Sequence, residues 1–455
     1  MIVPAVTFVA ALAAALRWGR PALRWLVVLA VVLAPLRGGL LALAAEIDLA
    51  DSELAINALV PALVAAIAMG VAVKLRPGIR DLPLPLLIAT GLIGLVALFD
   101  LPAQVVGLKL YAVGLAQYLV YPILAIAAWP LCEPGDLRKL TRLIIAMGGV
   151  VAVTVLIQAS GIENFIQSAS GEVEGLAANR YAGITGSYLH TSSFLGIVGA
   201  LTMGELLGLR TRRQAILGVV LLAVVFSGLI LTFSRSGVVI AGIAVIALFA
   251  LAARGRRPAF SAMVAVAVAV ALVVGAIGGV GPGAAGERVG SGFDPTGDSG
   301  NSLRAEAFSA AIHRFGRAGA AQQAFGEGLG ATGNARKLVS KEPVVVESYY
   351  LKLLVETGVL GVVAIGGFLV WAGYAFGRSL WRRRAPWAVS VAAAGLGLSL
   401  YNAIYPALEA QILALVWWLL LAICLRSEAE KLMSSADDEG EAVPAPGKRT
   451  PLLVR

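Results

Sequence analysis

The stretch VVVESYYLKLLVETGVLG, residues 344–361, lies where the longest polar part of the chain returns to an apolar helix. It closes a segment, residues 281–361, that is the only long one without the composition of a membrane span. That segment opens with turn-forming sequence (GFDPTGDSGN, residues 292–301) and continues with an amphipathic helix, predicted from Ser302 to about Arg317. A Gly-rich turn follows (FGEGLG, residues 325–330). Connections this long are usually functional, so we expect the rest of the chain to hold this segment at one face of a membrane.

The composition of the whole chain predicts that this segment is flanked by membrane spans. Of 455 residues, 59% are hydrophobic and only 14% are charged, and the mean hydropathy is +0.87. A soluble protein could not bury so much apolar surface, which predicts an all-α polytopic membrane protein. The net charge of +9 comes from short clusters between apolar runs, a pattern of membrane orientation that argues against nucleic acid as a partner. The two cysteines, Cys132 and Cys424, lie near span ends of the predicted cytoplasmic side, so no disulfide is expected.

Apolar runs of about spanning length predict a bundle of about 12 or 13 transmembrane helices, the first being short for a bilayer. They lie at residues 2–16, 22–43, 55–73, 82–99, 103–130, 140–158, 189–209, 214–233, 236–252, 259–280, 350–376, 387–405 and 407–425.

The connections between these runs alternate in charge. One set is basic and contains the clusters at residues 17–24, 74–80, 138–142, 210–213, 254–257 and 378–384. The other set is acidic or neutral and contains residues 46–53, Asp100, residues 163–174, residues 232–237, the long segment and residues 402–409. The positive-inside rule places the basic set in the cytoplasm and the long segment outside. The predicted organisation is an N-terminal bundle (1–280), a large external loop (281–349), C-terminal spans (350–425) and a disordered cytoplasmic tail (426–455).

Arg235 is an unusual residue for its place. It lies in LTFSRSG, residues 231–237, on the side where basic residues are otherwise depleted. A guanidinium at a membrane boundary is kept mainly where it pairs with an anion or lines a polar cavity. Ser234 and Ser236 beside it favour an anion site at a helix start. The alternative is an arginine that extends to the lipid headgroups.

Arg304 begins the predicted loop helix. At 100° per residue it shares a face with Phe308, Ala311 and Phe315, and this face is expected to dock against the bundle. An ordinary solvated arginine fits the spacing equally well. His313 points nearly opposite and is interpreted as a surface histidine.

Glu347 precedes the aromatic and apolar helix that enters the next span, and a carboxylate there can act as a general base. The alternative is an acid stabilised by the N-terminal end of the helix dipole, which would lower its pKa. Tyr349 and Tyr350 serve either as interfacial anchors or as a platform for sugar stacking. The acids of residues 46–53 are interpreted as a solvated loop, and Asp294, Asp298 and Asn301 as turn formers.

The chain resembles the O-antigen ligase and polymerase superfamily over roughly residues 175–400. The resemblance is carried, in order, by RYAGITGSYLH (180–190), TFSRSG (232–237), SLR (302–304), GEGLG (326–330) and YLKLLVETGVLG (350–361).

This resemblance implies an all-helical GT-C-like glycosyltransferase in the bacterial inner membrane, with its active site facing the periplasm and no metal or other cofactor. The implied donor is a glycan on undecaprenyl diphosphate, and the implied acceptor is another glycan or a lipid-linked glycan. Membrane lipids, a chain-length regulator and a flippase are the implied partners. Arg235 and Arg304 would bind the diphosphate, Glu347 would act as base, and Arg180, Ser234, Ser236, Tyr349 and Tyr350 would contact substrate, with inversion at the anomeric carbon.

One position departs from the family pattern. Where ligases of this family carry histidine followed by asparagine, this chain has Glu347 and Ser348. This favours a polymerase of lipid-linked repeat units, with a ligase that moves finished glycan as the alternative. A small-anion transporter is the hypothesis from another class, although the unusual polar residues gather at one face and no half-to-half repeat is visible.

Overall fold

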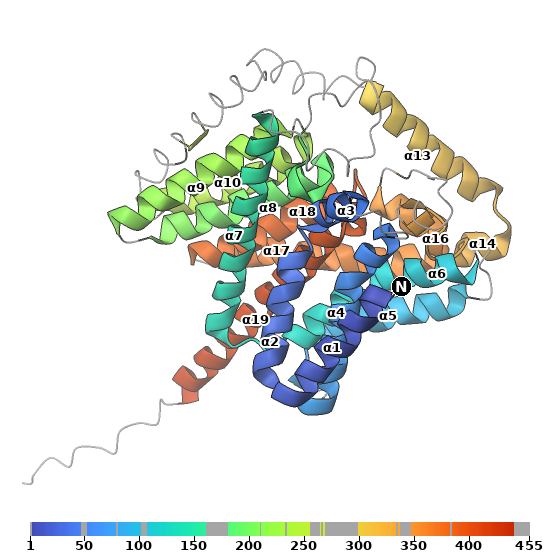
Figure 1. Cartoon of the computed structure of the whole chain (residues 1–455), viewed down its shortest axis with the longest axis horizontal. Coiled ribbons are helices and arrows are strands. Elements are labelled where there is room, and N and C mark those ends of the chain that lie inside the picture. The colour runs from blue at the N-terminus through green and yellow to red at the C-terminus, as the bar shows by residue number, and fades with distance from the viewer. Residues whose placement is uncertain are drawn as a thin grey trace, which may run out of the picture.

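The computed structural model describes residues 2–46, 52–78, 81–101, 107–160, 181–209, 211–232, 234–254, 264, 267–268, 299–333, 335–336, 346, 348–382 and 385–440. The described residues are 86% helix and contain no strand (Figure 1). An apolar segment in hydrocarbon has to satisfy its backbone hydrogen bonds internally, which a helix does. The all-α prediction is confirmed.

The N-terminal half contains seven helices in the described ranges. Prolines stand at the starts of three of them, α2, α5 and α7, where the missing N–H group has no helical partner to lose. The helix α7 also has a capping box between Glu133 and Asp136. The helices are α1 (Ile2–Trp18), α2 (Arg20–Leu33), α3 (Arg37–Glu46), α4 (Ser52–Lys74), α5 (Leu84–Asp100), α6 (Leu108–Ala128) and α7 (Pro134–Ala159).

The rest of the chain adds a central group of helices, the helices of the long segment and a C-terminal group. The central group is η3 (Gly183–Thr185), α8 (Tyr188–Gly208), α9 (Arg212–Leu231) and α10 (Arg235–Arg254). The long segment contributes α13 (Ser299–Arg317) and α14 (Ala320–Phe325). The C-terminal group is α16 (Tyr349–Gly361), a π-helical turn η4 (Val362–Gly366), α17 (Gly367–Arg382), α18 (Pro386–Tyr401), η5 (Ala407–Glu409) and α19 (Gln411–Gly440).

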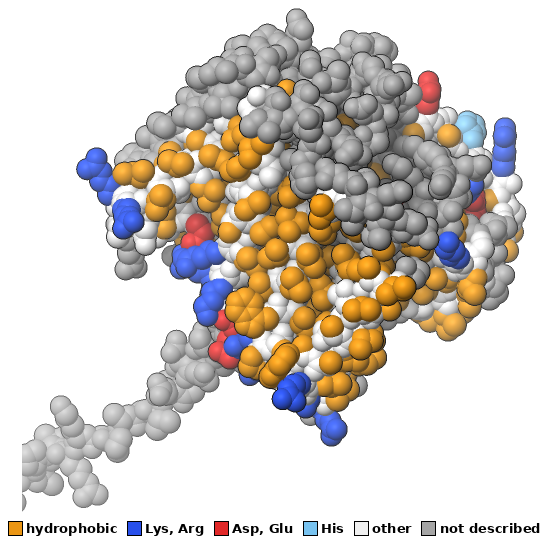
Figure 2. Space-filling view, viewed as in Figure 1, with side chains coloured by type: hydrophobic (Ala, Val, Ile, Leu, Met, Phe, Trp, Pro, Cys, Tyr) orange, Lys and Arg blue, Asp and Glu red, His pale blue; other side chains and the backbone are white. Residues whose placement is uncertain are grey.

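Six described helices are long and apolar enough to cross a membrane, and a seventh span results if α2 and α3 are counted together. Five shorter apolar helices accompany them, so six, one and five give 12 helical units, one for each of 12 predicted apolar runs. The remaining run, 259–280, lies almost entirely outside the described residues. Large apolar side chains such as Ile246 and Trp381 are 73% and 83% exposed, and Figure 2 shows a broad hydrophobic surface. These features are compatible with a multi-pass membrane protein.

Two predicted boundaries differ from the structure. The run 22–43 is a pair of helices bent by 73°, because Pro35 lies in the break and cannot donate a helical hydrogen bond. The last helix does not end near residue 425 but continues to Gly440, through a segment rich in strong helix formers. The predicted tail is therefore helical over residues 426–440, while residues 441–455 lie outside the described residues.

Basic connections gather on one side of the molecule. Arg24 donates to Glu133 at 2.8 Å, which joins the start of α2 to the start of α7. Arg138 donates to both carboxylate oxygens of Glu205 at 2.8 and 2.9 Å, and Arg142 to the same carboxylate at 3.3 Å. In Figure 2 basic side chains lie at the left and lower margins, and others lie at the right-hand edge. The arginine pairs hold the ends of α2, α7 and α8 together near basic connections.

Connections of the other predicted set also meet one another. The Arg37 Nε atom donates to Asn57 Oδ1 at 2.5 Å, and Gln411 donates to the Asn57 carbonyl at 2.7 Å. The Tyr349 N–H donates to the Asn402 carbonyl at 3.1 Å. The starts of α3, α4 and α19 are thus joined, as are the end of α18 and the start of α16. This second side carries the candidate site.

Glycines bring central helices into backbone contact. A Cβ atom at Gly196 of α8 would lie 2.4 Å from the Gly237 carbonyl oxygen of α10. A Cβ at Gly148 of α7 would lie 2.3 Å from the Val198 side chain. Small residues allow helices in a membrane to pack closely, and these contacts fix the start of α10 against α8.

Candidate functional site

The start of α16 holds a buried ion cluster. Lys352 and Glu356 occupy positions i and i+4 of the helix, and the Lys352 Nζ atom lies 3.0 Å from Glu356 Oε1. The same ammonium contacts a carboxylate oxygen of Glu409, in η5. Lys352 and Glu356 are 1% and 0% exposed, and Glu409 is 8% exposed. Buried charges persist only when they are paired, and this pairing ties α16 to the turn before α19.

The Glu356 carboxylate joins two further chain segments. Its Oε1 atom also accepts from the Thr332 N–H at 2.9 Å and from the Thr332 hydroxyl at 2.7 Å. Its Oε2 atom accepts from the Tyr118 hydroxyl of α6 at 2.8 Å. The Lys352 ammonium lies 5.7 Å from the centre of the Tyr118 ring. Among the described residues, the hydrogen bonds to this carboxylate come from α6, α16 and the turn after the Gly-rich sequence.

A break in α16 completes the attachment of that turn. Gly358 has φ 63° and ψ −166°, a conformation open mainly to glycine. Because the helix is interrupted there, carbonyls of the preceding turn can accept bonds from outside it. The Glu327 N–H donates to the Val355 carbonyl at 2.9 Å, and the Gly328 N–H donates to the Glu356 carbonyl at 3.0 Å. The Gly-rich turn is thus held by the backbone and the side chain of the same helix.

The glycines of the turn allow its backbone to lie close to α16 and η5. Gly326, Gly330 and Gly333 all have positive φ. A Cβ atom at Gly326 would lie 2.2 Å from the Glu356 carbonyl oxygen, and one at Gly333 would lie 2.0 Å from the Glu409 carboxylate. These positions explain the Gly-rich composition of residues 326–333 as a requirement of packing against α16 and η5.

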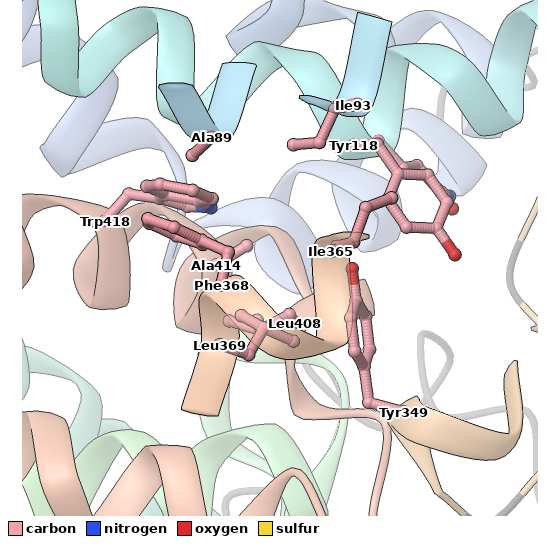
Figure 3. Close-up of a pocket in the computed structure, with 11 residues that line it drawn as sticks. Ala89, Ile93, Tyr118, Tyr349, Ile365, Phe368, Leu369, Leu408, Ala414 and Trp418 are labelled. Atoms are coloured by element: carbon pink, nitrogen blue, oxygen red, sulfur yellow. The ribbon is translucent and has the colours of Figure 1, made fainter. Parts of the chain in front are cut away.

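A small cavity of about 10 Å³ lies next to this cluster (Figure 3). The Tyr118 and Tyr349 side chains line it at one end, with ring centres 6.1 Å apart. Phe368 and Trp418, stacked 5.5 Å apart, line the other end. The lining residues are Ala89, Ile93, Gln117, Tyr118, Tyr349, Ile365, Phe368, Leu369, Leu408, Ala414 and Trp418. The cavity has room for about one water molecule.

Hydroxyl groups surround the start of α10. The Ser192 hydroxyl of α8 donates to the Ser234 carbonyl at 3.1 Å and accepts from the Gly237 N–H at 3.1 Å. The Ser234 and Ser236 hydroxyls lie 2.9 Å apart. Arg235 is the first residue of α10. The Gly237 N–H is bonded to Ser192, so the groups described here that could donate to an anion are the Ser234 and Ser236 hydroxyls.

One chain of contacts links this hydroxyl cluster to α16. His190, two residues before Ser192 on α8, lies with its Nε2 atom 3.4 Å from the Tyr405 hydroxyl. Tyr405 belongs to the turn after α18, which also supplies the Asn402 carbonyl to the Tyr349 N–H. The start of α8 therefore contacts both the start of α10 and the turn formed by residues 402–409, and this turn contacts the start of α16.

The residues proposed from sequence divide into two groups. Ser234, Ser236 and Tyr349 lie in the contacts above, and Tyr350 is half-buried on the same helix turn as Tyr349. Arg235 and Arg304 lie within α10 and α13, but their side chains are outside the described part of the structure. Glu347 and Arg180 lie outside the described residues altogether.

The predicted orientation of the loop helix is confirmed. Ala311 of α13 is 5% exposed and packs with Leu351 and Val355 of α16. His313 is exposed. The face that also carries Arg304 in the helical repeat therefore docks on α16.

Several site residues were not singled out by the sequence reasoning. They are Lys352, Glu356, Glu409, Tyr118, Thr332, His190 and Tyr405. The first two had a usable signal, because ionisable residues inside an apolar helix are functional candidates by default. The others are distant in sequence, and their chemistry appears only when the helices are packed.

No protein-family model matches the chain, and no curated protein matches it. The resemblance to the O-antigen ligase and polymerase superfamily rests on the motifs and on their order along the chain.

Proposed function

We propose that this protein is a membrane glycosyltransferase that polymerises oligosaccharide repeat units carried on undecaprenyl diphosphate. The observation that carries the proposal is the series of contacts that joins the start of α10, through the start of α8 and the turn of residues 402–409, to the start of α16. The first residue of α10 is Arg235, and serine hydroxyls surround that helix start. The start of α16 directly follows Glu347 and Ser348. The start of α10 would thus bind the diphosphate group, and the residue before α16 would accept the proton.

The proposed reaction is a single displacement. An acceptor hydroxyl oxygen forms a bond to the anomeric carbon of the donor, and the bond from that carbon to the diphosphate oxygen breaks. Glu347 takes the hydroxyl proton, and undecaprenyl diphosphate leaves with both electrons of the broken bond. Arg235 and Arg304 stabilise the charge that grows on the leaving diphosphate, because a guanidinium pairs with phosphate oxygens in a bidentate manner. Tyr349, Tyr350 and Arg180 would contact the sugars.

The proposal includes a GT-C-like fold, a large loop outside the cell membrane and an active site facing the periplasm. It is supported by the two separate groups of connections, since the basic group belongs in the cytoplasm under the positive-inside rule. The described helices of the long segment, α13 and α14, join the group opposite the basic one through their contacts with α16.

Arginine variants test the mechanism. Arg235→Ala and Arg304→Ala should each lower glycan polymerisation about 100-fold or more, as expected when a group that stabilises transition-state charge is removed. Arg213→Ala, an exposed arginine at the start of α9, is the matched control and should polymerise normally. Polymerisation is measured from the length distribution of lipid-linked glycans on gels. Full activity in both site variants would exclude the proposed roles.

The ligase alternative differs in the product that accumulates when the protein is absent. A strain lacking a polymerase accumulates lipid-linked single repeats, whereas a strain lacking a ligase accumulates long lipid-linked chains. The same gel analysis of a deletion strain therefore separates the two enzymes.

A small-anion transporter is a second candidate, and the buried cluster of Lys352, Glu356 and Glu409 favours it. Ionisable residues inside membrane helices often mark ion pathways, and Tyr118, which binds Glu356, lies near the middle of α6. Anion flux into vesicles separates the candidates. Loss of polymerised glycan with unchanged flux in Arg235→Ala and Arg304→Ala would exclude transport.

A further inference from the structure

A hollow of about 520 Å³ lies outside the site described above, between α13, α14 and the start of the Gly-rich turn. Polar side chains line it, namely His313, Arg314, Arg317, Gln322 and Glu327. Figure 2 shows a histidine with basic and acidic side chains at the right-hand edge, over the position of α13 and α14 in Figure 1. The volume falls within the range of small-ligand sites in proteins.

The helix α13 presents these side chains because of its repeat. His313, Arg314 and Arg317 stand at spacings of one, three and four residues, which places Arg314 and Arg317 beside each other on one side of the helix. Ala311 packs on α16, and Arg314 lies next to it, three residues later, whereas His313 and Arg317 lie farther round the helix. The part of α13 turned away from α16 thus lines the hollow.

The walls are held by an ion pair. Arg314 donates through Nε and Nη2 to the two carboxylate oxygens of Glu327, at 2.7 and 2.5 Å. This bidentate pair joins α13 to the turn and fixes both side chains. Two arginines and one glutamate leave one positive charge, and Arg317, which is exposed, supplies it.

The hollow is attached to the candidate site through the same turn. The Glu327 N–H donates to the Val355 carbonyl of α16, while Thr332, five residues later, binds the Glu356 carboxylate. The turn therefore has the hollow on one side and the buried ion cluster on the other.

We propose that this hollow binds an acidic oligosaccharide, one that carries carboxylate groups. Guanidinium, carboxamide and carboxylate groups are planar hydrogen-bonding partners suited to sugar hydroxyls. The exposed guanidinium of Arg317, which has no ion-pair partner among the described residues, pairs with a sugar carboxylate. The volume exceeds what a lone inorganic anion fills. Use of the bound glycan as acceptor rests on the proposed function, whereas binding itself does not.

Isothermal titration calorimetry on the full-length chain in detergent tests the site. The probe is tetragalacturonic acid, and maltotetraose is its uncharged match. Tetragalacturonic acid should bind, and maltotetraose should bind at least tenfold more weakly. Arg317→Gln should weaken binding of the acidic probe about tenfold, the effect of losing one charge-assisted hydrogen bond, and Arg317→Lys should weaken it less.

Arg213→Gln is the matched control, because it removes the same charge from an exposed helix start on the basic side, and it should bind like the wild type. Equal binding of both probes, wild-type affinity in Arg317→Gln, or binding only to phosphatidylglycerol vesicles would each overturn the proposal. Failure of the glycosyltransferase proposal would leave the calorimetry unchanged. Conversely, if the protein polymerises glycan but does not bind tetragalacturonic acid, only the proposed role of the hollow is overturned.

Discussion

The carboxylate of Glu356 is buried and accepts hydrogen bonds from four donor groups of the described residues. The Thr332 N–H and hydroxyl, the Lys352 ammonium and the Tyr118 hydroxyl are its donors. A buried ion pair of this kind adds little net stability over a well-packed apolar group, but removing one partner leaves the other charge unpaired. We therefore interpret the cluster as a device that specifies how α16, the Gly-rich turn and η5 fit together.

Replacement of Glu356 should destabilise the protein strongly. Glu356→Ala leaves the Lys352 ammonium with Glu409 alone and the Thr332 N–H unbonded, and should lower the free energy of unfolding by about 3–5 kcal/mol. Glu356→Gln keeps the size and one acceptor oxygen and should have a smaller effect. The measurement is the thermal unfolding midpoint in detergent.

Glu306→Ala, at an exposed position of α13, is the control and should change the free energy of unfolding by less than about 0.5 kcal/mol. Equal midpoints for Glu356→Ala and Glu306→Ala would show that the cluster does not hold the turn.

Only part of the buried ion cluster was predictable from the sequence. The spacing of Lys352 and Glu356 is visible in the sequence and predicts a pair on one helix face. The third member, Glu409, is far away in the chain, and neither spacing nor composition relates it to Lys352. Tyr118 and Thr332 are equally remote, so the cluster required the packed structure.

At the scale of the elements, α8 and α10 meet through glycine. The Gly196 and Gly237 backbones are in direct contact, so that a side chain at either position would push the helices apart. This contact lies beside the Ser192, Ser234 and Gly237 hydrogen bonds. The helix interface and the proposed anion site therefore depend on the same close approach.

Gly196→Ala should destabilise the protein by about 1–3 kcal/mol, because the added methyl group overpacks against a backbone oxygen that cannot rotate away. Gly242→Ala, on α10 itself, is the matched control, since nothing lies within 4 Å of a Cβ there. It should be neutral or stabilising by up to about 1 kcal/mol through helix propensity.

The thermal midpoints of the two variants provide the comparison. A Gly196→Ala midpoint at or above that of Gly242→Ala would mean that α8 and α10 are not packed as described.

The helices that were predictable from the sequence are those that coincide with apolar runs. Apolar runs of spanning length become helices because no other backbone structure satisfies its hydrogen bonds in lipid. The bend between α2 and α3 was missed because the run 22–43 is apolar on both sides of Pro35. The extension of α19 was missed because charged residues were interpreted as disorder, although many of them favour helix.

At the scale of the whole molecule, the two groups of connections define two sides. The arginine pairs with Glu133 and Glu205 lie on one side, and the turns around α16 lie on the other. Charge alternation along the chain predicts two such sides from the sequence, and the assignment of one of them to the cytoplasm stays a prediction. Sequence reasoning did not relate turns far apart in the chain on the second side to one another, because those contacts are tertiary.

Cys132 offers a direct test of sidedness. It lies between α6 and α7 on the basic side, and burial raises the pKa of its thiol to about 11. The thiolate is the reactive form, so labelling by a membrane-impermeant maleimide should be slow at pH 7. The rate should rise about tenfold per pH unit until the pH approaches the pKa. We expect labelling in inside-out vesicles and protection in right-side-out vesicles.

Cys132→Ser should abolish the label, because Cys424 is only 3% exposed. Labelling of the wild type in intact right-side-out vesicles would reverse the predicted orientation and place the long segment in the cytoplasm.

The bridge from Lys352 to Glu409 has a consequence for biosynthesis. Lys352 enters the membrane with the helix that begins at Tyr349, yet Glu409 is translated 57 residues later, just before the last helix. During that interval Lys352 has been synthesised, but Glu409, its second carboxylate partner, has not. The nascent protein therefore finishes the connection between α16 and η5 only as translation nears its end, and a chain truncated before residue 409 would present an incompletely neutralised lysine to the quality-control proteases of the membrane.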